Sequence, residues 1–148
     1  MSFDPYNKLH RFEEIAEKVS KLSDYKYKVG AVIFKKGRVV SVGYNQCKTH
    51  TKLLKYFEHA TIHAECDAIL HCPNPGHLDG SSIFVYRTTK DGAPAMAKPC
   101  PMCRQLIFEN GIKMVYWSTH EFPYWQSAKA VDLFNEVDPV KAYQVNKI

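Results

Sequence analysis

Two short motifs supply three metal-binding side chains and one spare carboxylate. His63-Ala64-Glu65 provides an imidazole and a carboxylate, and Cys100 and Cys103 provide two thiols with two residues between them. One nitrogen and two sulfurs suit zinc better than magnesium or calcium, which prefer oxygen ligands. Three protein ligands leave a fourth position open, as catalytic zinc sites do. The sequence therefore predicts a catalytic zinc centre built from His63, Cys100 and Cys103.

The residues around both motifs predict how the fold brings them together. Apolar spacing predicts one helix at 61–71 and another at 100–109, with a strand at 82–87 between them. Each motif then lies at the N-terminal end of a helix, where the helix dipole favours a thiolate over a thiol. Two such helix ends that meet at one point would form a metal-binding cage.

The remaining segments predict an α/β fold. We expect a helix at 6–22, a hairpin of strands at 29–34 and 39–44 that turns at Gly37, loops at 88–98 and 122–125, a strand at 112–117 and a last helix at 128–136. Gly30 and Gly43 in the hairpin indicate close approach of another backbone. The strand–helix–strand unit implies parallel strands, whereas the hairpin is antiparallel. We predict a mixed central sheet with helices on both faces, a three-layer α/β/α arrangement.

Length and composition narrow the class of protein. The 148 residues suit a single domain, 1–148, and apolar residues make up 45% of them. No apolar run approaches the roughly 20 residues of a membrane-spanning helix, and no signal peptide is visible, so we expect a cytoplasmic protein without membrane association. An odd number of cysteines, five, argues against a disulfide framework. The net charge of +5 favours a phosphate-bearing substrate or nucleic acid.

Glu65 is the candidate catalytic residue. Zinc lowers the pKa of a water molecule to about 7, and Glu65 could take the proton and pass it to a substrate. A lone Cys-x-x-Cys also occurs in redox pairs and structural zinc sites, but a structural site needs a fourth ligand. Cys66 and Cys72 are interpreted as core thiols. A second zinc site that uses these two, Cys47 and the other histidines stays open as an alternative.

The chain resembles the cytidine and deoxycytidylate deaminase superfamily over roughly residues 8–118. His63-Ala64-Glu65 matches the family's His-Ala-Glu, and residues 99–103 match its Pro-Cys-x-x-Cys. Gly43-Tyr44-Asn45 resembles the Gly-x-Asn that follows the family's second strand. The resemblance implies the cytidine deaminase-like fold, a Zn²⁺ cofactor, a homo-oligomer and hydrolytic deamination at C4 of cytosine or C6 of adenine.

The resemblance also implies roles for individual residues. The three predicted zinc ligands keep their role, and Glu65 would shuttle protons. Asn45 would hydrogen-bond the sugar or the base edge, and the backbone at Ala64 would hold the base. Arg104 would support the thiolates from the second coordination shell. Histidine as the first ligand resembles deoxycytidylate, tRNA adenosine and polynucleotide cytidine deaminases, whereas Cys-Arg-Gln at 103–105 resembles free cytidine deaminases.

Two substrate classes follow from these patterns. We favour a free cytosine nucleotide or nucleoside, with deoxycytidylate (dCMP) first, because the chain is short and basic residues gather only weakly near the motifs. Lysines of the 45–59 loop, Arg87 or Lys90 could meet a 5′-phosphate. The alternative is a deaminase acting on cytosine or adenine in single-stranded DNA or RNA. Its base-stacking residues would be His50, Tyr56, Phe57, Tyr124 and Trp125. A non-catalytic zinc module is disfavoured because Glu65 is present.

Overall fold

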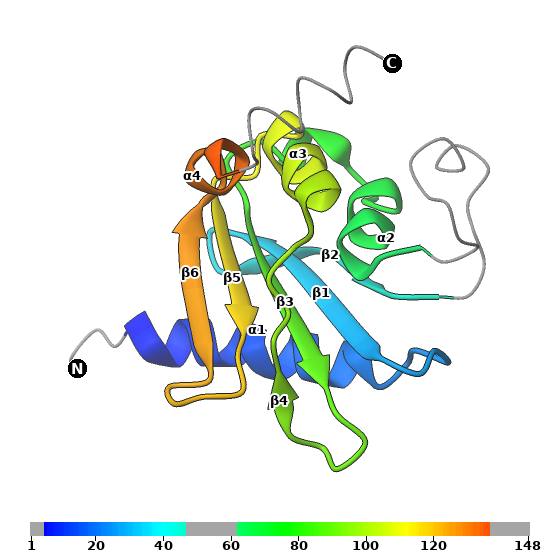
Figure 1. The fold of residues 1–148 in the computed structure, drawn as a ribbon. Helices are drawn as coiled ribbons and strands as arrows, with labels where there is room; N and C mark the ends of the chain where they lie inside the picture. The colour runs from blue at the N-terminus through cyan, green and yellow to red at the C-terminus, as the bar shows by residue number, and fades with distance from the viewer. Residues whose placement is uncertain (1–4, 47–61, 137–148) are drawn as a thin grey trace.

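The structure, a computed structural model, describes residues 5–46 and 62–136, with side chains from residue 8 onward. These residues form a mixed sheet with helices on both faces (Figure 1). The elements, in chain order, are α1 (Pro5–Ser20), β1 (Lys28–Lys35), β2 (Arg38–Tyr44), α2 (Ala64–Leu70), a 3₁₀ helix η2 (Pro75–His77), β3 (Ser82–Thr88), β4 (Pro94–Ala95), α3 (Pro101–Glu109), β5 (Met114–Ser118), β6 (Trp125–Lys129) and α4 (Ala130–Asn135).

The sheet combines one parallel strand pair with antiparallel pairs. Its strand order is β2-β1-β3-β5-β6, and the short β4 pairs with the end of β3. β3 and β5 are parallel, as predicted for strands joined through a helix, and β1 and β2 form the predicted antiparallel hairpin. Lys36 (φ 53°) and Gly37 (φ 76°) both adopt positive φ at the turn. This conformation matches the right-handed twist of hairpin strands, and Gly37 adopts it without steric cost.

Alternating strand residues bury two separate faces of the sheet. On one face, Phe12 and Ala16 of α1 pack against Val32, Phe84 and Tyr86. The intervening residues point to the other face, where α2, α3 and α4 cover them. Figure 1 shows α1 crossing one side of the sheet and the other three helices gathered on the opposite side. The predicted three-layer α/β/α arrangement is confirmed.

Two glycines allow helices to lie directly against the hairpin. A Cβ atom on Gly43 of β2 would lie 2.6 Å from the carbonyl oxygen of Ala64 and 2.9 Å from the Cα of Ala68, both in α2. A Cβ atom on Gly30 of β1 would lie 2.9 Å from the Cα of Ser20 in α1. The predicted close approach at both glycines is confirmed. Across the described residues, no helix is both long enough and apolar enough to cross a bilayer.

The predictions for three segments were wrong, beyond small shifts at the ends of other elements. The helix predicted at 61–71 begins only at Ala64, because the backbone of Ile62 forms an antiparallel bridge with Gln46, with hydrogen bonds of 3.0 and 3.1 Å. The loop predicted at 88–98 contains the short strand β4. Residues 125–129, predicted as the end of a loop and the start of a helix, form β6. β6 is an edge strand with half-buried and exposed residues, so it lacks the apolar run that marks a strand.

Candidate active site

The three predicted zinc ligands lie at the N-terminal ends of two neighbouring helices. His63 is the N-cap residue of α2, Cys100 is the N-cap residue of α3, and both have extended backbones. Neither side chain caps its own helix. Instead, the His63 Nδ1 atom lies 3.3 Å from the Cys103 Sγ atom and 3.7 Å from the Cys100 Sγ atom. The structure thus brings together residues that are about 40 positions apart in the sequence.

The spacing of these donor atoms fits a zinc ion. Tetrahedral zinc with ordinary Zn–N and Zn–S bond lengths separates the nitrogen from each sulfur by about 3.6 Å. The observed distances of 3.3 and 3.7 Å bracket that value. Within the described ranges, one group of histidine, cysteine or acidic side chains could hold a metal ion, namely His63, Cys100 and Cys103. Their donor atoms lie within 4.8 Å of one another.

The two ligand thiols differ in their electrostatic surroundings, and one of them favours the thiolate form. A hydrogen bond with Cys103, helped by one with His63, lowers the pKa of Cys100 to about 4. The pKa of Cys103 is raised, first by its hydrogen bond with Cys100 and then by one with Cys66, whose sulfur lies 3.8 Å away. The hydrogen bond to Cys100 also raises the pKa of His63. These shifts favour the thiolate form at Cys100, and a bound cation would favour ionisation of the Cys103 thiol as well.

Glu65 lies beside the ligands but is buried. It is the second residue of α2 and only 5% exposed. Burial raises the pKa of its carboxyl group, and the charge of His63 opposes that rise. A carboxyl group that accepts a proton more readily than usual is suited to take a proton from water and release it to a substrate.

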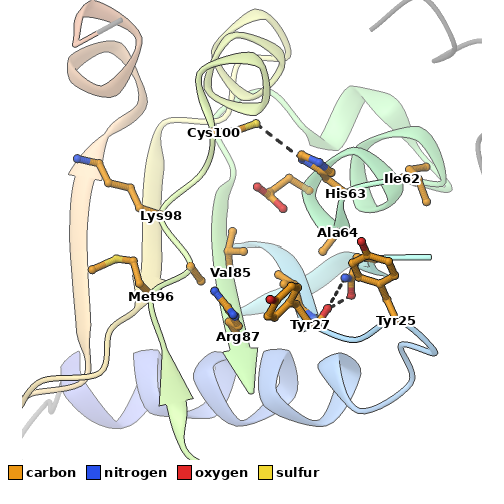
Figure 2. Close-up of a pocket in the computed structure, with 14 residues that line it drawn as sticks. Tyr25, Tyr27, Ile62, His63, Ala64, Val85, Arg87, Met96, Lys98 and Cys100 are labelled. Carbon is orange, nitrogen blue, oxygen red and sulfur yellow. Dashed lines mark hydrogen bonds between the residues drawn. The ribbon is translucent and has the colours of Figure 1, made fainter. Parts of the chain in front are cut away.

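A pocket of about 490 Å³ opens onto this cluster. His63, Glu65 and Cys100 line one end, and Tyr27 and Arg87 line the other. Figure 2 shows His63 and Cys100 well separated from Arg87 and Tyr27, with Val85 between them. The volume lies within the range of about 300–1,000 Å³ that is common for small-molecule sites.

Both predicted substrate-contact residues also line the pocket. Ala64 is the first residue of α2, and Asn45 follows β2 directly. The Asn45 Oδ1 atom accepts a hydrogen bond of 2.9 Å from the Val29 N–H, and its Nδ2 atom donates to the Tyr27 carbonyl. These bonds fix the orientation of the amide group and leave one amide hydrogen able to donate to a ligand.

The sequence did not reveal the buried residue that holds this segment, Asp67. Its Oδ2 atom accepts hydrogen bonds from the Tyr44 N–H (3.0 Å) and the Gln46 Nε2 atom (3.1 Å), and its Oδ1 atom lies 2.7 Å from the His71 Nδ1 atom. Asp67 thereby joins α2 to both neighbours of Asn45. In the sequence, Asp67 is only a second acidic residue in the first turn of a helix. Acidic residues are common there, so the position did not indicate that Asp67 holds another segment.

Arg104 supports the backbone before the first cysteine. Its Nε atom donates a hydrogen bond of 2.8 Å to the Pro99 carbonyl, and its Nη1 atom lies 3.6 Å from the Glu136 carboxylate. These contacts hold the chain that leads into Cys100. The predicted interaction of Arg104 with the thiolates themselves stays a prediction.

Several other predicted residues lie away from the pocket or outside the described ranges. Cys66 and Cys72 are 1% and 7% exposed, which confirms them as core thiols. Trp125 packs against Tyr116 with ring centroids 6.2 Å apart, and neither it nor Tyr124 is among the described residues that line the pocket. The predicted residues outside the described ranges are Cys47, His50, Tyr56, Phe57 and the lysines of the 47–59 segment.

The α/β/α fold and the His/Cys/Cys cluster beside a buried glutamate define a metal-dependent hydrolase site of the deaminase type. Residues 6–119 match the family described as the cytidine and deoxycytidylate deaminase zinc-binding region, and the chain belongs to this family. It is therefore a zinc-dependent hydrolytic deaminase, and residues His63, Cys100 and Cys103 could bind the metal ion.

Individual relatives agree with this assignment. The chain is 36% identical to an uncharacterized deaminase in the luxG 3′ region of Aliivibrio fischeri, over 72% of this chain and 69% of that protein. It is 32% identical to the deoxycytidylate deaminase of Mycobacterium phage D29, over 61% and 77%. The crystal structure of dCMP deaminase from cyanophage S-TIM5 in complex with dCMP and dUMP shares the fold, with a TM-score of 0.58 and 23% identity over 91% of this chain and 94% of that one.

Proposed function

We propose that this chain deaminates a free cytosine nucleotide or nucleoside to the uracil form, with dCMP as the favoured substrate. The observation that carries the proposal is one pocket that joins the His63/Cys100/Cys103 cluster and the buried Glu65 to a distant arginine, Arg87. The pocket has the volume of a site for a small molecule. The similarity to the deoxycytidylate deaminase of Mycobacterium phage D29 supports the same substrate class.

The roles of the residues follow from their positions. His63, Cys100 and Cys103 would hold zinc, which would supply a Lewis acid able to lower the pKa of a water molecule to about 7. The Glu65 carboxylate takes one proton from the attacking water as the C4–O bond forms and delivers it to the N3 atom of cytosine. It then takes the second proton from the new C4 hydroxyl group and delivers it to the amino group, which leaves as ammonia when the C4–N bond breaks. Since the Glu65 side chain is buried, its carboxylate is more accessible to a ligand in the pocket than to bulk solvent, which favours proton transfer to the substrate.

The neighbouring residues hold the substrate for that step. The backbone at Ala64 meets the base, and the remaining amide hydrogen of Asn45 donates to the sugar or the base edge. The bonds from Asn45 to Val29 and Tyr27 support this role, because they hold the amide in one orientation before a ligand arrives. The sheet that runs through the described residues supports a single deaminase domain over 1–148. Assembly into a homo-oligomer stays a prediction.

The test is a substrate panel on the zinc-loaded protein. Product would be quantified with dCMP, deoxycytidine, cytidine, cytosine, a single-stranded DNA and a tRNA. The Glu65→Gln variant keeps the size of the side chain but cannot carry the proton, so we expect turnover to fall about 10²- to 10⁴-fold. Glu121→Gln, at a side chain that is 84% exposed, is the matched control and should keep wild-type turnover.

Each outcome has a distinct meaning. Turnover of a monomeric cytosine compound that Glu65→Gln abolishes while the protein keeps one zinc per chain would support the proposal. Turnover of the DNA or the tRNA alone would refute the small-molecule reading and favour the polynucleotide alternative. Full activity of Glu65→Gln would refute the role of Glu65 in proton transfer.

A further inference from the structure

Among the described residues that line the pocket are Arg87 and Lys98, and the surroundings of these two cationic side chains differ. The Lys98 Nζ atom lies 3.0 Å from the Glu136 carboxylate, which also approaches Arg104. The charge of Lys98 is therefore already balanced. In contrast, none of the ion pairs recorded between described residues involves Arg87. A half-buried guanidinium group in a pocket favours an anionic ligand when no carboxylate of the protein neutralises it.

Arg87 is held in place by the sheet and by an aromatic ring. Its backbone pairs with Val29 of β1 and Ala95 of β4, and its N–H donates a hydrogen bond of 3.0 Å to the Ser118 Oγ atom. The central carbon of the guanidinium group lies 4.5 Å from the centroid of the Tyr27 ring. A cation–π contact is not a hydrogen bond, so the N–H donors of the guanidinium group remain able to bind a ligand.

Tyr27 also connects Arg87 to the residue predicted to contact the sugar. The Tyr27 carbonyl accepts a hydrogen bond from the Asn45 Nδ2 atom. The same tyrosine therefore fixes the amide of Asn45 through its backbone and the guanidinium of Arg87 through its ring. A ligand that reaches from Asn45 toward the far end of the pocket would next meet Arg87.

The position of Arg87 matches the far end of a nucleotide. Figure 2 shows Arg87 and Tyr27 at the end of the pocket away from His63 and Cys100. A cytosine nucleotide that reacts at C4 must present its base to the metal site. Its sugar then follows, and its 5′-phosphate lies farthest from the reacting carbon.

We propose that Arg87, held against the Tyr27 ring, binds the 5′-phosphate of the substrate and makes the enzyme select a nucleotide over the corresponding nucleoside. This inference rests on the proposed deaminase function. The two planar N–H donors of an arginine match two phosphate oxygens, and such charge-assisted pairs are among the stronger hydrogen bonds in proteins.

The test compares dCMP with deoxycytidine in three zinc-loaded proteins. Arg87→Gln removes the guanidinium group, and we expect kcat/KM for dCMP to fall about 10- to 100-fold, while kcat/KM for deoxycytidine stays within about twofold. Arg38→Gln is the matched control, since it makes the same substitution at an exposed site outside the pocket lining. It should leave both values within about twofold, because exposed charges act weakly through solvent.

A binding measurement separates this inference from the proposed function. The affinity of dCMP and of deoxycytidine for the Glu65→Gln form, which should not turn over, is measured with and without Arg87→Gln. Preferential loss of dCMP binding supports the role of Arg87 even if no cytosine compound is deaminated, an outcome that would refute only the proposed function. Equal losses for both ligands, no preference of the wild-type protein for dCMP, or the same loss of dCMP selectivity in Arg38→Gln would each overturn the inference.

Discussion

The contact between Gly43 and α2 leads to a prediction that links core packing to metal binding. In Gly43→Ala, the new Cβ atom would lie 2.6 Å from the Ala64 carbonyl oxygen and 2.9 Å from the Cα of Ala68. Both neighbours are backbone atoms, so no side chain can rotate to make room. Ordinary contact between carbon atoms requires about 3.5–4.0 Å, so α2 must move by roughly 0.5–1 Å.

The expected loss of stability can be estimated from this overlap. Overpacking of a core typically costs about 1–3 kcal/mol, and the lower chain entropy of unfolded alanine relative to glycine offsets about 0.4–1 kcal/mol. For 148 residues, an unfolding entropy of about 2.1 cal/mol/K per residue converts each kcal/mol into roughly 3 °C. The net cost is about 0–2.6 kcal/mol, so we expect the Tm of Gly43→Ala to fall by up to about 8 °C in a thermal scan.

Zinc affinity should fall as well, because α2 carries His63. A metal site tolerates ligand displacements of only about 0.2 Å, which is smaller than the required movement of the helix. We expect zinc affinity, measured by competition with a chromophoric chelator, to fall about 10- to 100-fold, as it does when support around a ligand is lost.

Gly30→Ala is the matched control for this experiment. It forces the same kind of contact, 2.9 Å from the Cα of Ser20, but against α1 on the opposite face of the sheet. Its Tm should fall similarly while zinc affinity stays within about twofold, since α1 supplies none of the proposed ligands. Unchanged zinc affinity in Gly43→Ala, or an equal loss in Gly30→Ala, would refute a specific link through α2.

Three further substitutions test other parts of the site. Cys103→Ala removes one proposed ligand and should leave well under one zinc per chain by elemental analysis. Cys72→Ala, at a core thiol, is the control and should keep the metal. Similar zinc content in both variants would exclude Cys103 as a ligand. Arg104→Gln loses the Nε donor to Pro99 and should weaken zinc binding about 10- to 100-fold in the chelator assay, unless that backbone contact is irrelevant to the metal. Asp67→Asn weakens the acceptor for the segment around Asn45 and should lower the Tm by about 3–9 °C. It should also raise KM while zinc is retained. An unchanged KM would show that Asp67 supports only the fold.

The sequence predicted the parts of the fold that depend on local patterns. The β1–β2 hairpin, α1, β3 and α3 have apolar periodicity and turn residues within a few positions of one another, so their approximate bounds could be inferred. The metal cluster was also predictable, because His63 and the two cysteines occur in short motifs that each precede a helix. The structure supports this expectation by placing His63 and Cys100 at equivalent N-cap positions.

Features that depend on distant residues could not be inferred in the same way. The late start of α2 depends on the bridge between Gln46 and Ile62, and the pairing of β6 depends on β5, so neither has a local signal. Asp67 looks like an ordinary helix residue until its contacts with Tyr44 and Gln46 are known. The contact between Tyr27 and Arg87 likewise requires the register of β1 against β3, which pairs Val29 with Arg87.

The residues proposed to carry out the reaction and those proposed to select the substrate lie in different parts of the fold. The proposed metal ligands and Glu65 lie at the ends of α2 and α3, whereas Tyr27 and Arg87 belong to the β1–β3 side of the pocket. A disturbance of the helices, such as Gly43→Ala, should therefore reduce turnover of nucleotide and nucleoside by the same factor, because both react at the same metal. A change at Arg87 should alter the ratio between them and leave zinc affinity unchanged. Metal content and the dCMP-to-deoxycytidine ratio are thus independent readouts of the two halves of the pocket, and a variant of one half that changed both would contradict this separation.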